Sequence, residues 1–149
     1  KITQHYKKSM ATRSHIYFCD REPGVSFNEH HQDKVEFMIY NHYDSHPHTL
    51  GVTLGAYLED VKFHDMGCLA AGVVGKLKMT ACHDGDCIPK VGDIYLVNPN
   101  CLIDSHGYEE YTYYIWTKPD CKEIWISVFN DDICLFVGPP RTLQTKYED

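Results

Sequence analysis

Hydrophobic and polar residues alternate along most of this chain with the period of two that is typical of β-strands. In the segment 68–82, for example, Leu77 and Met79 fall on one predicted face, while Lys78 between them falls on the other. Further segments of this kind recur at short intervals until residue 137. We predict eight strands, which cover residues 15–19, 35–40, 52–63, 68–82, 93–97, 111–117, 123–129 and 133–137.

Turn-forming sequences separate several of these segments, including Asn98-Pro99-Asn100 and Lys118-Pro119-Asp120. Eight short strands joined by such turns predict an all-β fold in which two antiparallel sheets stack as a sandwich. Residues 58–63 also fit a helical period, but we interpret them as a strand or its exit. No repeat, low-complexity tract or linker interrupts the chain, so we predict one domain over residues 1–149.

Composition and charge exclude some classes of protein but do not identify a single function. The 149 residues are 43% hydrophobic and 23% charged, which is typical of one globular domain. Acidic residues outnumber basic ones by 21 to 14, so the net charge of -7 argues against a nucleic-acid partner and permits a basic protein partner. No apolar run approaches the roughly 20 residues of a membrane helix, and we expect no membrane insertion.

Seven cysteines are dispersed along the chain, which in an aromatic-rich β protein favours an oxidised framework over seven free thiols in a reducing cytosol. Cys82 and Cys87 flank the Asp84-Gly85 turn, and a short hairpin could bring them into disulfide range. We expect this pair to be a structural disulfide in preference to a metal site. The connectivity of the others and the identity of the odd thiol stay open. The other cysteines are Cys19, Cys68, Cys101, Cys121 and Cys134.

A short segment, residues 41–48, concentrates three histidines, His42, His46 and His48, around Asp44. Groups so close could bind zinc or copper. We interpret them instead as a polar loop, because Pro47 separates His46 from His48 and nothing fixes His42 on their side. We therefore predict no metal site and assign His46 and His48 to a partner contact. Ten histidines in all suggest a pH-dependent contact between about pH 7 and pH 5.

A second candidate contact lies in residues 108–116, where tyrosine and tryptophan adjoin two acids. Aromatic side chains bury a large area at low entropic cost, and carboxylates could meet a basic patch on a partner. We interpret most of the segment as a strand with alternate side chains in the core. The predicted contact is therefore the preceding turn, Tyr108, Glu109 and Glu110.

Motifs that imply catalysis are missing from the sequence. Neither Gly-x-Ser-x-Gly nor His-Glu-x-x-His occurs. Ser105 and His106 adjoin Asp104, but a catalytic triad is assembled in space, and adjacency in sequence is usually accidental. A cysteine–histidine pair formed only by the fold would be invisible at this level. We expect no enzyme, no catalytic residue and no cofactor.

The chain resembles the poxvirus immune-evasion domain family, as seen in residues 35–43, 67–72 and 82–85. The resemblance covers about two-thirds of the chain. The resemblance is strongest to the family's endoplasmic-reticulum-lumenal branch, which includes a cowpox virus protein that retains MHC class I molecules. Members of this family are secreted or lumenal β-sandwich proteins that bind host immune proteins such as chemokines, cytokines and MHC class I. The resemblance implies no catalytic residues, and it assigns no contact surface, because different members use different ones.

The compartment expected from these features is the host endoplasmic reticulum lumen or the exterior of the cell. The chain begins at Lys1 instead of Met, which a cleaved secretory signal and a trimmed chain explain equally well. The lumenal branch ends in a retrieval tetrapeptide of the Lys-Asp-Glu-Leu kind, whereas this chain ends at Lys146-Tyr147-Glu148-Asp149. Either the end is trimmed or the protein is not retained.

We therefore expect a viral immune-evasion protein that binds a host immune protein, with MHC class I as the first partner, and retains or blocks it. A secreted chemokine or cytokine trap is the alternative that suits the acidic balance, because chemokines are mostly basic. A metal-dependent enzyme that uses His42, His46 and His48 is the alternative from another class. The oligomeric state stays open, including dimerisation through an exposed edge strand.

Overall fold

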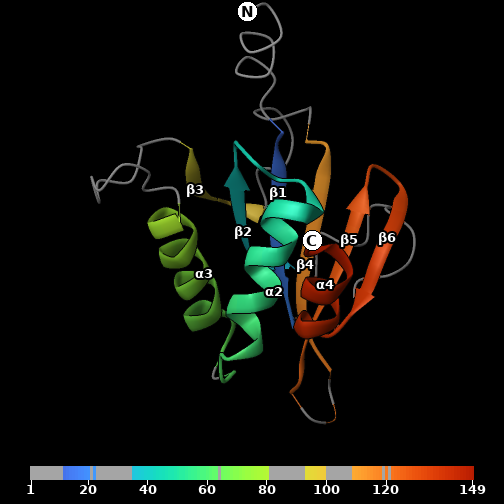
Figure 1. Ribbon diagram of the computed structural model, residues 1–149. Helices are drawn as coiled ribbons and strands as arrows, with labels where there is room; N and C mark the ends of the chain where they lie inside the picture. The colour runs from blue at the N-terminus through green and yellow to red at the C-terminus, as the bar shows by residue number, and fades with distance from the viewer. Residues whose placement is uncertain are drawn as a thin grey trace, which may run out of the picture.

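The computed structural model describes residues 12–20, 22, 35–63, 65–80, 93–99, 109–118, 120 and 122–149. Within them, two strands are followed by a run of helices, then by four strands and a last helix, as Figure 1 shows. The strands are β1 (Ser14–Cys19), β2 (Val35–Asn41), β3 (Ile94–Val97), β4 (Tyr111–Thr117), β5 (Ile124–Asn130) and β6 (Ile133–Gly138). The helices are η2 (Pro47–Gly51), which is one π-helical turn, α2 (Val52–Glu59), α3 (Met66–Thr80) and α4 (Pro140–Tyr147).

All six strands belong to one sheet, in the order β3-β2-β1-β4-β5-β6. Neighbouring strands are antiparallel except at the centre, where β1 and β4 run parallel. The prediction of a strand-rich chain is confirmed, and each of these strands overlaps one that the alternation predicts. The two remaining predicted strands, 52–63 and 68–82, are not strands.

Helices α2, α3 and α4 cover one face of the sheet and take the place that the sandwich prediction gave to a second sheet (Figure 1). The two-sheet sandwich is therefore not confirmed within the described residues. The core lies between the sheet and this helical layer. Its fully buried members include Ile16, Phe18, Ile39, Leu54, Val73, Tyr113, Ile115, Ile126, Val128 and Leu143. The opposite face carries a second buried cluster of Tyr17, Cys19, Met38, Tyr114, Trp116 and Phe129.

The strands predicted at 52–63 and 68–82 are wrong, because their apolar residues also satisfy a helical spacing. In α3 the buried residues Leu69, Val73 and Leu77 recur every fourth position and face the sheet. Alternation placed Leu77 and Met79 on one face, yet Leu77 is 5% exposed and Met79 is 59% exposed. No helix in the described part of the chain is long and apolar enough to cross a bilayer.

Helix α4 was not predicted, although the sequence marks its start. Pro139 and Pro140 begin it, and proline is favoured at the first helical positions because its missing N–H would have no partner there. The helix packs on α2 so closely that a Cβ added to Gly55 would lie 2.6 Å from the carbonyl oxygen of Pro140. Only glycine admits this approach of two backbones.

Strand β6 is an edge of the sheet, and two features protect it from pairing with another strand. Phe129 pairs with Cys134 and Val128 with Phe136, so Leu135 is an extra residue that forms a bulge. The ammonium of Lys146 donates a hydrogen bond of 2.8 Å to the carbonyl oxygen of Leu135. Bulges and lysine side chains both commonly prevent edge strands from pairing with another chain, so the structure does not favour dimerisation through β6.

The predicted disulfide framework is not confirmed by the described cysteines. Cys68 and Cys134 are exposed free thiols, and Cys19 is a buried thiol in β1. The predicted pair Cys82 and Cys87 lies outside the described residues, as do Cys101 and Cys121.

We predict that Gly55→Ala lowers the free energy of unfolding by about 1–3 kcal/mol, because the new methyl group must push the α4 backbone away from α2. Gly75→Ala is the matched control: Gly75 lies in α3 with no atom within 4 Å of an added Cβ. Alanine should stabilise that helix by up to about 1 kcal/mol. Urea unfolding of both variants checks this, and equal stabilities would contradict the α2–α4 contact.

Candidate partner-binding site

Four separate segments of the chain meet at one end of the sheet. Ser14 at the start of β1 pairs with Asn41 at the end of β2 and with Tyr111 at the start of β4. Tyr111 in turn pairs with Asn130 at the end of β5. The residues just beyond these positions must therefore lie side by side, although they are far apart in the sequence.

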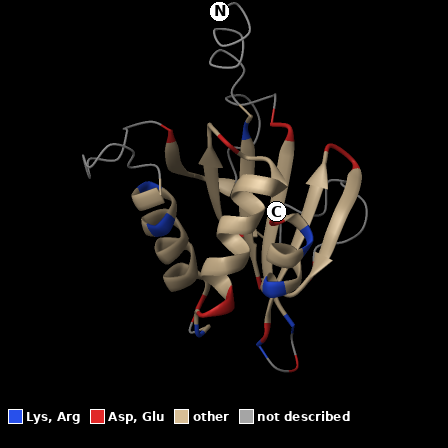
Figure 2. Cartoon of the chain, viewed as in Figure 1, with Lys and Arg blue, Asp and Glu red and all other residues tan. Residues whose placement is uncertain are grey.

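Carboxylates concentrate at this end, which we call the acidic end. It comprises Asp44, Asp93, Glu109, Glu110, Asp131 and Asp132. Figure 2 shows acidic residues at the ends of successive strands here. Backbone hydrogen bonds join the segments: Glu110 N–H donates to the carbonyl of Arg13, Asp131 N–H to that of Glu110, and His42 N–H to that of Asp93. Asp44, Glu110, Asp131 and Asp132 are exposed, so their charges face solvent.

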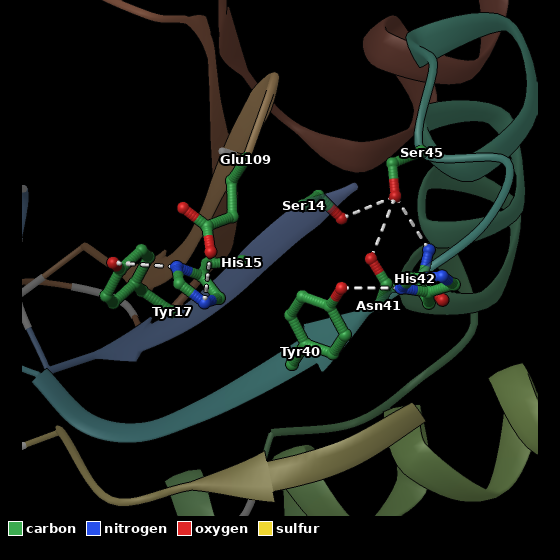
Figure 3. Close-up of polar contacts among 8 residues, drawn as sticks. All are labelled: Ser14, His15, Tyr17, Tyr40, Asn41, His42, Ser45 and Glu109. Carbon is green, nitrogen blue, oxygen red and sulfur yellow. Dashed lines mark hydrogen bonds and ion pairs between the residues drawn. The ribbon is translucent and has the colours of Figure 1, made fainter. Parts of the chain in front are cut away.

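Buried hydrogen bonds to Ser45 hold the loop after β2 in place (Figure 3). The Ser14 hydroxyl and the Asn41 side-chain amide both donate to Ser45 Oγ, at 2.8 and 2.9 Å. The hydroxyl of Tyr113 donates to the carbonyl oxygen of Ser45 at 2.6 Å. Ser45 is completely buried, and these bonds fix the neighbouring Asp44 and His46 at the surface.

The structure brings together two contacts that the sequence predicted separately. His46 Nδ1 lies 3.1 Å from the Tyr111 hydroxyl and its Nε2 lies 3.0 Å from Thr12 Oγ1. His46 therefore sits directly beside the strand that follows Glu109 and Glu110. His48 is also exposed, with Nδ1 3.2 Å from the carbonyl oxygen of Tyr147 in α4. Tyr108, the remaining predicted contact, lies outside the described residues.

The histidines 42, 46 and 48 each have a different partner. His42 Nδ1 lies 2.6 Å from the Tyr40 hydroxyl, whereas His46 and His48 contact Tyr111 and Tyr147. Within the described ranges, no three metal-ligating side chains come together. The described residues therefore contain no cluster of ligands that a metal-dependent enzyme could use.

A partly buried polar cluster that the sequence did not predict adjoins the acidic end, on the sheet face opposite the helices. His15 Nε2 lies 3.2 Å from Glu109 Oε1, and the two side chains are 11% and 15% exposed. His15 Nδ1 lies 3.4 Å from the Tyr17 hydroxyl (Figure 3). The imidazole also meets the rings of Tyr17 and Tyr40 edge-on. Alternation does place His15 and Tyr17 on one face, but it cannot show that Glu109 reaches them.

The electrostatics of this cluster favour neutral tyrosines. Burial raises the pKa of Tyr17, and the nearby Glu109 carboxylate raises it further. The same two causes, in the same order, raise the pKa of Tyr95 in β3. A tyrosine that acts as a nucleophile or base needs a lowered pKa instead. The cluster is thus suited to hydrogen bonding and to fixing Glu109, which in turn places Glu110 at the surface.

No family model, curated protein or solved structure gives a significant match to this chain. The site must therefore be interpreted from its own residues.

We predict that stability falls as the pH rises above 10, the ordinary tyrosine pKa. The unfolded chain ionises there, while burial keeps the folded phenols neutral, so the stabilisation is complete below pH 10 and is lost above it. Urea unfolding and phenolate absorbance from about pH 8 to pH 11 check this. Ionisation of all tyrosines near pH 10 with the fold intact would contradict it. Burial raises the pKa of Tyr17, Tyr40, Tyr95, Tyr111, Tyr113 and Tyr114.

Proposed function

We propose that this protein is a non-catalytic binding protein that docks a host immune protein at the acidic end. The observation that carries the proposal is the meeting of four exposed carboxylates with His46 and exposed Tyr43 at one end of the sheet. Loops fixed by buried hydrogen bonds lose little entropy on binding, and tyrosine is enriched in protein interfaces.

MHC class I is the first partner to test, because the family resemblance supports it. A viral protein of this kind would retain or block its ligand in the endoplasmic reticulum lumen or outside the cell. In such a compartment the Cys82–Cys87 pair would be oxidised. The single sheet with a helical layer departs from the two-sheet fold that the resemblance implies, so the support comes from the sequence alone.

A basic chemokine or cytokine is the second candidate, and the charge of the site favours it. Four carboxylates of the acidic end are exposed and outnumber Arg13, which lies among them, so they attract a basic ligand over a distance comparable to the Debye length, about 8–10 Å at physiological salt. By contrast, the opposite end of the sheet mixes both signs, with Glu59, Lys122 and Arg141 among its exposed residues. A basic ligand should therefore orient toward the acidic end.

We predict that the triple variant Glu110→Gln, Asp131→Asn, Asp132→Asn weakens binding of the true partner about tenfold in low salt, because three attractive charges are lost. The matched control Glu36→Gln, Asp60→Asn, Asp120→Asn removes the same charge from exposed positions elsewhere and should change affinity less than about twofold. Biosensor titrations with purified MHC class I and with a basic chemokine, at several salt concentrations, measure both effects.

The outcomes distinguish the two candidate ligands from each other, and they also test whether the acidic end is the binding site. Steep salt dependence with the chemokine alone identifies a trap, whereas binding of MHC class I alone identifies a retention factor. Binding that both triple variants weaken equally would reject the acidic end. Failure of both ligands to bind the unmodified protein would reject the proposed function.

A further inference from the structure

A cavity of about 330 Å³ opens at the end of the sheet opposite the acidic end. Three segments form its walls: the end of α2 with the residues after it, the β4–β5 hairpin, and the β6–α4 junction. Figure 1 shows α2 ending beside the start of α4 here. We call this cavity the mixed-charge pocket. Its volume is within the range of about 300–1,000 Å³ for sites that bind small molecules.

The floor of the mixed-charge pocket is apolar. Leu58, Ile124 and Pro140 line it and are buried, and Phe63 adds a half-buried aromatic ring. Such a floor favours an aliphatic or aromatic group, because burying it removes apolar surface from water.

The rim carries charges of both signs from two opposing segments. Glu59 and Arg141 come from the helical side, with Arg141 Nε 3.7 Å from Glu59 Oε1. Lys122 and Glu123 come from the hairpin. Figure 2 shows both colours at this end. Two carboxylates beside two cations leave the rim with no net charge, so it gives no net attraction to a polyanion such as a nucleotide or to a polycation, whereas a ligand that carries one charge of each sign can contact both.

Lys122 has a backbone φ of 53°, a region that costs a residue other than glycine free energy. Glycine adopts this backbone conformation without that cost, because it has no Cβ. A lysine here is therefore not explained by the local fold, and residues in such conformations cluster at ligand sites.

We propose that the mixed-charge pocket binds a small zwitterion with an apolar side chain, of which a free apolar amino acid is the simplest. Its side chain occupies the floor, its carboxylate lies near Arg141 and Lys122, and its ammonium lies near Glu59 and Glu123. This site does not depend on the proposed partner at the acidic end.

Amide chemical-shift titrations of the whole chain with leucine, leucinamide and N-acetylleucine test the assignment. Leucine should shift the amides of residues 58–63 and 122–124. Leucinamide lacks the carboxylate and N-acetylleucine lacks the ammonium, so each should bind at least about tenfold more weakly. No shift from any of the three ligands up to about 20 mM would overturn the proposal, as would equal affinity for all three.

Variants give an independent test. Arg141→Met should weaken leucine binding and should not weaken the residual leucinamide binding, because leucinamide has no carboxylate for Arg141 to contact and the loss of Arg141 frees Glu59 for the ammonium. Lys122→Gly should raise the melting temperature and weaken leucine binding together. Lys76 lines a neighbouring groove between α2 and α3 that shares only Val61 with the mixed-charge pocket, so Lys76→Met is the control and should change neither the melting temperature nor leucine binding. A control that weakens binding as much as Arg141→Met would also overturn the proposal.

Discussion

The parallel pairing of β1 with β4 at the centre of the sheet is the constraint on which the rest of the structure depends. Parallel neighbours begin at the same end, so the residues before Ser14 and before Tyr111 must meet. The antiparallel strands on either side add the loop after β2 and the β5–β6 turn to that end. A surface of carboxylates, His46 and Tyr43 therefore results from one pairing between distant segments.

Local pattern was sufficient for the strands because each is short and rich in β-branched and aromatic residues, and turn residues bound several of them. It failed for α2 and α3, whose apolar residues satisfy both periods. In α2, for example, Leu54 and Leu58 fit periods of two and of four equally. Length could have decided the second case, since the 15 residues of α3 exceed the usual strand. The two prolines at the start of α4 were a helix signal that alternation alone does not use.

The individual residues of the candidate site could be predicted from the sequence, but their proximity in the fold could not. Residue type alone indicated His46, Glu109 and Glu110 as contacts. Their proximity depends on strand order, which no local signal encodes, and the same holds for Glu109 beside His15. His42, His46 and His48 also do not come together, because each contacts a tyrosine residue in a different element, β2, β4 or α4.

Hydrogen–deuterium exchange of the protein alone and in complex with its ligand tests the docking surface most directly. The loop of residues 42–46, the start of β4 and the β5–β6 turn should become protected together, because the acidic end places them under one partner. The exposed faces of α2 and α3 should exchange as before. Protection confined to the helical layer, or to only one of the three segments, would contradict the account.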